Sequence, residues 1–208
     1  MAPTLRAQDF SKYRGFSLGT NLAGVLKLSE QKLADVKTIH VRPTLIQELT
    51  WWPPSSPGAS SGPDSVEQML FSFSNGDLYK ISVTYDHSST EGLTAGDMVK
   101  SISAKYGPPT GVESEIDSVV GARYNMEQNS LASWQDSQYS FNLVRSSFTD
   151  RFGLVIYSKP INAEAALAIA EAVKLEEQAR PETEANQRKK EADDLETLRQ
   201  KNQKSFHP

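Results

Sequence analysis

The chain has 208 residues and a formal net charge of −4, with acidic and basic residues interspersed. This balance excludes the basic surface by which proteins bind nucleic acid. Cysteine is absent, so disulfides, thiol catalysis and thiolate metal sites are excluded, and no apolar run is long enough to cross a bilayer. The length suits one ordinary domain with additional segments.

Residues 1–13 are expected to be an extension that precedes the folded domain. They contain no apolar signal core, yet Leu5-Arg-Ala-Gln8 is similar to the tail of a signal-peptide cleavage region. One hypothesis is that Met1 replaces a removed export signal, and the other is an ordinary cytosolic start. The first hypothesis favours an extracytoplasmic location, periplasmic or secreted.

The expected domain, residues 14–160, opens with a short helix. The pattern predicts this helix near 21–28, with Thr20 as its N-cap, and Ser29 would cap a second short helix that reaches Val36. The buried side of the first helix should carry Leu22, Val25 and Leu26.

Residues 39–52 are predicted to be extended, with Leu45, Leu49 and Trp51 on one face. Pro43 favours an edge strand or a bulge near the start of this segment. The following Pro-, Gly- and Ser-rich residues, 53–64, are predicted to form a loop.

The strongest pattern predicts a β-hairpin over residues 66–86. A two-residue Asn75-Gly76 loop would pair Phe71 with Lys80 and split the apolar faces. A three-residue loop, 74–76, pairs Phe71 with Tyr79, so we predict the longer loop. The resulting core face holds Met69, Phe71, Tyr79, Ile81 and Val83, and the polar face holds Ser72, Lys80, Ser82 and Thr84.

A second helix is predicted to start after Thr94, because Asp97 three residues later completes a capping box, and to stop at Gly107. Its buried stripe would be Met98, Val99, Ile102 and Tyr106. Strands are expected near 122–127, 131–136, 138–147 and 152–158, the last being apolar on both faces and therefore central or covered. Leu18-Gly19-Thr20 and Gly92-Leu93-Thr94 open the two halves, which indicates either a duplicated helix–strands unit or a chance similarity.

Residues 161–208 are expected to form a charged helical C-terminal extension. Ala166, Leu167, Ala170 and Val173 give a narrow apolar stripe that could dock one helix. Pro181 should interrupt that helix or start another, and Glu184→Arg188 is a supportive pair. Because the segment has too few heptads for a coiled coil, we expect at most weak self-association through this helix.

Two polar clusters contain residue types that occur in catalytic or cation sites. Asp86-His87-Ser88 contains the three residue types of a catalytic triad, but sequence neighbours rarely form one, so an ordinary strand exit is the preferred interpretation. The acidic segment Glu113–Asp117 lacks the ligand spacing of a cation site, so we expect a solvated surface. We therefore expect no catalytic residue, metal or cofactor.

Trp51 and Trp52 are the best candidates for a binding site. Adjacent strand residues face opposite sides, so one tryptophan should join the core and Trp52 should lie at an exposed rim. Exposed tryptophans commonly anchor partners, and we expect Trp134 to contribute to the same surface. The alternative is that both Trp51 and Trp52 are buried, the second beneath the C-terminal helix.

The helix openings, the Asn75-Gly76 hairpin and the Leu93-Thr94…Tyr106-Gly107-Pro108 ending resemble small exported domains of the β-lactamase-inhibitor-protein type and the related SmpA/OmlA-like envelope lipoproteins. The resemblance implies an α+β fold and a non-catalytic, protein-binding habit, although the lipidated cysteine of the lipoproteins is missing. We predict an α+β domain in which short helices cover one face of an antiparallel sheet. Its expected function is that of a protein-binding or structural module of the bacterial cell envelope, and the alternative is a hydrolase or small-ligand carrier whose site forms only in the fold.

Overall fold

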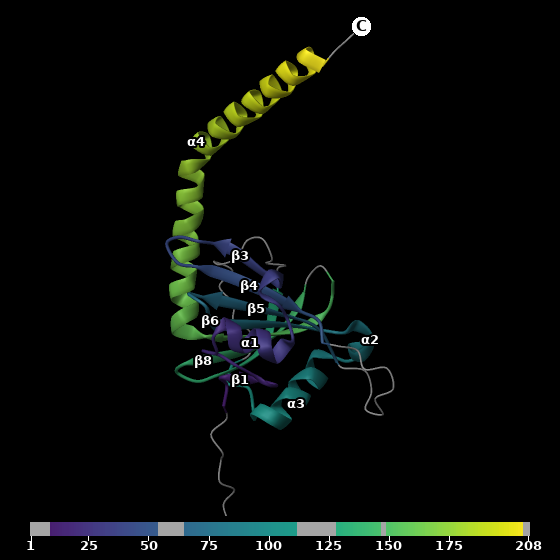
Figure 1. The fold of residues 1–208 in the computed structure, drawn as a ribbon. Coiled ribbons are helices and arrows are strands. Elements are labelled where there is room, and N and C mark those ends of the chain that lie inside the picture. The colour runs from purple at the N-terminus through teal and green to yellow at the C-terminus, as the bar shows by residue number, and fades with distance from the viewer. Residues whose placement is uncertain (1–8, 54–64, 112–127, 147–148, 206–208) are drawn as a thin grey trace, which may run out of the picture. The chain divides into compact units, whose positions relative to one another are not determined.

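A computed structural model describes residues 9–53, 65–111, 128–146 and 149–205 (Figure 1). The fold is α+β, as predicted, and the chain divides into two compact units, Met1–Ile169 and Ala170–Pro208. The first unit contains a seven-stranded antiparallel sheet, and the second is helical.

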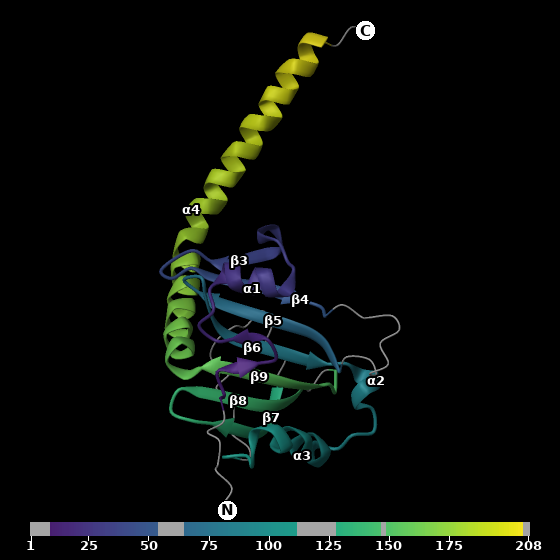
Figure 2. The ribbon, with the colours of Figure 1, turned by 60° about the horizontal axis from the view of Figure 1, so that its bottom comes forward.

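The large sheet consists of two meanders that meet along one seam. The first meander comprises β3 (Val36–His40), β4 (Ile46–Trp51), β5 (Val66–Ser74) and β6 (Asp77–Tyr85), and the second comprises β7 (Gln128–Gln135), β8 (Tyr139–Ser146) and β9 (Phe152–Ser158). The strand order is β3-β4-β5-β6-β9-β8-β7, so β6 and β9 form the seam (Figure 2). Since β9 lies between β6 and β8, the prediction of a central strand apolar on both faces is confirmed.

One continuous core joins the sheet to two helices and a small two-stranded ribbon. The helices are α1 (Leu22–Ser29) and α3 (Ala95–Tyr106), and the ribbon consists of β1 (Lys12–Tyr13) and β2 (Phe16–Ser17). We call the sheet face toward this core the helix face. Helix α3 has the predicted capping box of Thr94 and Asp97, ends at Gly107 with φ 75°, and buries Met98, Ile102 and Tyr106.

Helix α1 buries Val25 as predicted, but its cap differs from the prediction. Asn21, not Thr20, is the N-cap, because the Asn21 side chain accepts a hydrogen bond from the Gly24 amide at 2.9 Å. The expected second helix is only a 3-10 turn, η1 (Leu33–Asp35). The segment predicted as one extended run contains the turn between β3 and β4, where the Arg42–Pro43 peptide bond is cis.

The β5–β6 hairpin has the predicted position and a different register. Ser74 pairs with Asp77, so the loop is the two-residue Asn75-Gly76 turn, and Phe71 pairs with Ile81 rather than with Tyr79. A register shift between Ser72 and Phe73 makes this possible, since the extra residue on β6 returns Ile81 to the helix face. Tyr79 consequently lies on the opposite face, which we call the outer face, where it packs with Ile46 and Ala165.

Helix α4 (Lys159–Ser205) runs through Pro181 without the predicted interruption. Within the first unit its apolar contacts come from Ile161, Ala165 and Ile169, which pack against the outer face. The predicted stripe is thus displaced, and Leu167 is exposed. The expected strand near 122–127, the acidic segment Glu113–Asp117 and the Glu184 side chain lie outside the described part of the chain.

Candidate functional site

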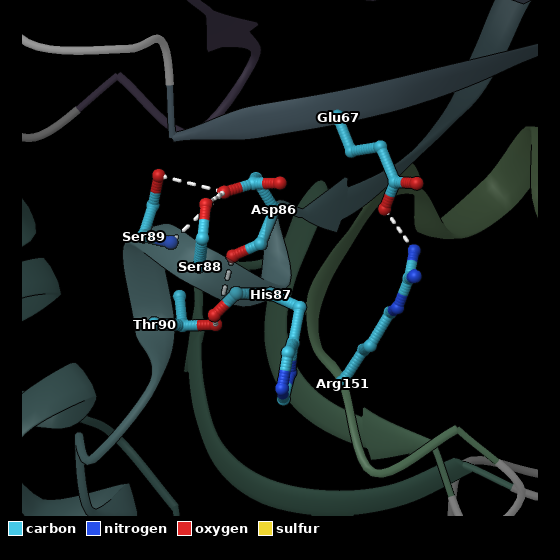
Figure 3. Close-up of polar contacts among 7 residues, drawn as sticks. All are labelled: Glu67, Asp86, His87, Ser88, Ser89, Thr90 and Arg151. Carbon is cyan, nitrogen blue, oxygen red and sulfur yellow. Dashed lines mark hydrogen bonds and ion pairs between the residues drawn. The ribbon is translucent and has the colours of Figure 1, made fainter.

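The polar cluster after the hairpin has a structural explanation (Figure 3). The Asp86 carboxylate accepts hydrogen bonds from the Ser89 amide at 2.8 Å and from the Ser88 hydroxyl, which makes it the N-cap of α2 (His87–Thr90). Figure 3 shows the His87 ring pointing away from both Asp86 and Ser88. The three triad residue types are therefore close in sequence but do not form a relay.

Glu67 and Arg151 form an ion pair beside this cluster (Figure 3). Glu67 belongs to β5 and Arg151 directly precedes β9, so the pair links the two meanders near the end of the seam. Its partners are both partly exposed, and such pairs contribute little to stability.

A hollow of about 330 Å³ lies on the outer face at the β3 end of the sheet. It collects side chains from three strands and from the segment between α1 and β3. Its lining residues are Gln31, Asp35, Lys37, Glu48, Thr50, Trp52 and Leu70.

The sheet register explains this grouping. Lys37 pairs with Glu48, and Thr50 pairs with Leu70, so residues on β3, β4 and β5 meet on the same face. Residues 48, 50 and 52 alternate along β4 and its end, which turns all three toward the hollow. Asp35 is the last residue of η1, directly precedes β3, and lines the same hollow.

The three tryptophans occupy different environments. Trp52 is 62% exposed at the hollow, as predicted for a rim residue. Trp51 points to the helix face, where its ring lies 5.5 Å from Phe16 and 6.4 Å from Phe71, centroid to centroid. The alternative that both are buried is thus wrong for Trp52.

The expected contribution of Trp134 to the surface is also wrong. Trp134 is 0% exposed, and its Nε1 donates a hydrogen bond of 2.8 Å to the carbonyl of Gly107. It faces the core because it alternates with Ser133, so it ties β7 to the end of α3.

Two charged residues near the hollow, Glu48 and Lys80, are partly buried and act on each other. Burial raises the pKa of the Glu48 carboxyl, although the ammonium groups of Lys80 and Lys37 act in the opposite direction. Burial lowers the pKa of Lys80, and the Glu48 charge partly offsets this. Glu48 therefore lies in a desolvated position with a lysine on either side along the register.

The Trp52 end of the hollow differs from the Glu48 end. Asp35 is exposed and accepts a hydrogen bond from the Lys32 amide through Oδ2 at 2.8 Å. Gln31 adds an amide on the same side. This end thus combines an open indole with a carboxylate and an amide.

Sequence reasoning identified Trp52 and missed its neighbours Gln31, Asp35, Lys37 and Glu48. The alternation of Glu48, Thr50 and Trp52 was a usable signal, since it places three side chains on one strand face. Lys37 reaches the hollow through the pairing of β3 with β4, which a single extended run over residues 39–52 does not contain.

Among the described residues, no three His, Asp or Glu side chains are grouped to hold a metal ion. None of the described helices has both the length and the apolar character needed to cross a bilayer. Comparisons with protein-family models, with characterised proteins and with solved structures gave no match.

Proposed function

We propose that the protein is a non-catalytic binding module that contacts a partner protein through the outer face of its sheet, around Trp52. The observation that carries the proposal is the exposure of this large aromatic side chain, 62%, at the rim of a hollow lined mainly by polar side chains. Tryptophan is enriched among the residues that dominate protein interfaces, and polar surroundings help such a residue stay exposed in the free protein.

The position of Trp52 on the scaffold supports the same proposal. Trp52 directly follows β4, and the neighbouring Trp51 is held by Phe16 and Phe71 on the helix face. The exposed indole is therefore carried on a backbone that the core fixes. A rigid anchor loses little conformational entropy when a partner covers it.

The test uses site-specific photo-crosslinking in the native organism. A benzoyl-phenylalanine at position 52 should give one defined protein adduct, and the same residue at position 28 is the control. Leu28 is 53% exposed and belongs to α1, which packs on the helix face.

The adduct must then be reproduced with the purified partner. We expect Trp52→Ala to weaken the affinity by at least about 30-fold, the effect of an interface hot spot, and Leu28→Ala to leave it unchanged. Equal adducts at both positions, or an unchanged affinity of Trp52→Ala, would contradict the proposal.

We also propose that the protein acts in the bacterial cell envelope. The support is the Leu5–Gln8 pattern and the resemblance to exported domains. Fractionation of the native organism should recover the protein outside the cytoplasm, and recovery with cytoplasmic markers would refute this location.

A further inference from the structure

We infer that the hollow receives a basic side chain of the partner, an arginine, stacked on the Trp52 indole and paired with the Asp35 carboxylate. This inference rests on the proposed function and specifies the chemistry of the contact. It is carried by the distribution of charge within the hollow.

The first step concerns the cations that already belong to the molecule. Lys37 pairs in register with Glu48, and Lys80 lies two strands away along the same row, across Ser72. Both ammonium groups act on the Glu48 carboxyl. The Glu48 charge therefore already has cations of the same chain acting on it.

The second step concerns the opposite end. Asp35 is exposed and lines the hollow together with Trp52, its aromatic residue. Its Oδ2 accepts the hydrogen bond of the Lys32 amide, which restrains the carboxylate. Trp52 is 62% exposed, which leaves much of its indole accessible to a partner.

The third step is the chemistry that suits this end. A guanidinium stacks on an indole face and donates in its own plane to a carboxylate, whereas an ammonium can satisfy only one of these geometries well at a time. The aliphatic part of an arginine can lie along Leu70, the second apolar lining residue. The net charge of −4 on the whole chain adds a favourable long-range attraction for a basic partner.

Acidic and uncharged anchors fit less well. A carboxylate in the hollow would meet the like charges of Asp35 and Glu48. An aliphatic side chain would displace water from the Asp35 and Gln31 polar groups without replacing the hydrogen bonds of that water.

The test is an NMR titration of the full chain with two small probes, N-acetyl-arginine amide and N-acetyl-citrulline amide. Citrulline has the same length and shape but no charge. The arginine probe should shift the Trp52 indole N–H resonance in a saturable way, and citrulline should bind at least about threefold more weakly. The Trp134 indole is an internal control, because it is buried and bonded to Gly107.

Matched variants locate the charge. Asp35→Asn should weaken arginine binding about three- to fivefold, the range of an exposed ion pair. Glu91→Gln, which removes an exposed carboxylate at the end of α2, away from the lining of the hollow, should leave it unchanged. Equal binding of the two probes, an unchanged affinity in Asp35→Asn, or no saturable shift with either probe would overturn the inference.

The outcome separates this inference from the proposed function. If the affinity for the partner depends on Trp52 but not on Asp35, the proposed binding function stands and the inferred arginine contact is refuted. If the arginine probe binds but position 52 gives no protein adduct, the proposed protein-binding function is refuted.

Discussion

Replacing Trp134 by phenylalanine should destabilise the protein far more than the same change at Trp52. Trp134 is completely buried and donates a 2.8 Å hydrogen bond to the carbonyl of Gly107, the C-cap residue of α3. Phenylalanine keeps an aromatic ring in the core and removes the donor. The Gly107 carbonyl would then lose its buried partner.

The magnitude follows from two contributions. Loss of this partly buried hydrogen bond costs about 1–2 kcal/mol. The smaller ring leaves a void of roughly 40 Å³, which adds about 1 kcal/mol at 24 cal/mol per Å³. We therefore expect Trp134→Phe to lower the free energy of unfolding by about 2–3 kcal/mol.

Urea denaturation followed by far-UV circular dichroism measures this difference without relying on tryptophan fluorescence. Trp52→Phe is the matched control, and its free energy of unfolding should stay within about 0.5 kcal/mol of the parent, since the side chain is 62% exposed. The slope of the unfolding free energy with urea should be unchanged in both variants. A cost below 0.5 kcal/mol for Trp134→Phe, or equal costs for the two variants, would refute the reasoning.

Three further predictions concern the sheet and the tail. A Cβ at Gly153 would lie 2.7 Å from the Val83 carbonyl oxygen, so Gly153→Ala should lower the free energy of unfolding by about 1–3 kcal/mol. Gly96 lies in the first turn of α3, where a Cβ has room, so Gly96→Ala should raise it by up to about 1 kcal/mol. Thermal unfolding of the two variants measures both effects. Burial raises the pKa of Tyr79 from 10.0 to about 12, which means that the native state holds the phenol proton more tightly than the unfolded state. Between pH 10 and pH 12 the free energy of unfolding of the parent should therefore fall by about 1–3 kcal/mol more than that of Tyr79→Phe. Urea midpoints measure this difference, and parallel pH curves for the two proteins would contradict it. Removal of residues 181–208 should leave the melting temperature within about 2 °C of that of the full chain. Removal of residues 161–208 exposes the cluster of Ile46 and Tyr79 on the outer face and should lower the melting temperature by more than about 5 °C. Calorimetry measures both, and equal melting temperatures of the two truncated chains would contradict the packing of α4 on the outer face.

Local capping and alternation predicted the second half of the fold closely. The Thr94–Asp97 capping box and Gly107 fixed both ends of α3, because these signals act within one turn of the helix. The alternating apolar residues of β8 and β9 likewise required only neighbouring residues to be recognised.

The hairpin register could not be obtained from alternation alone. The sequence pattern forced a choice between two regular loops, and the fold uses the shorter loop together with a bulge that absorbs the extra residue. The bulge is favoured because Tyr79 finds its own cluster with Ile46 and Ala165, a contact between segments far apart in sequence. Non-local contacts of this kind are invisible to periodicity.

The candidate site was predictable only in part for the same reason. The exposure of Trp52 follows from its position beside Trp51, but Asp35 and Lys37 reach the hollow through the β3–β4 pairing. That pairing depends on the turn at Pro43, which the sequence pattern did not distinguish from a bend or bulge in a continuous strand.

The seam between β6 and β9 has a consequence for the order of folding. Each meander is built from strands that pair with their neighbours in the chain, whereas Ile81 and Ile156 meet only when the two meanders come together. Closing such a long loop costs chain entropy before the new contacts repay it. The kinetic barrier should therefore lie at the seam, so that the rate of folding depends on β9 reaching the first meander rather than on the formation of either hairpin.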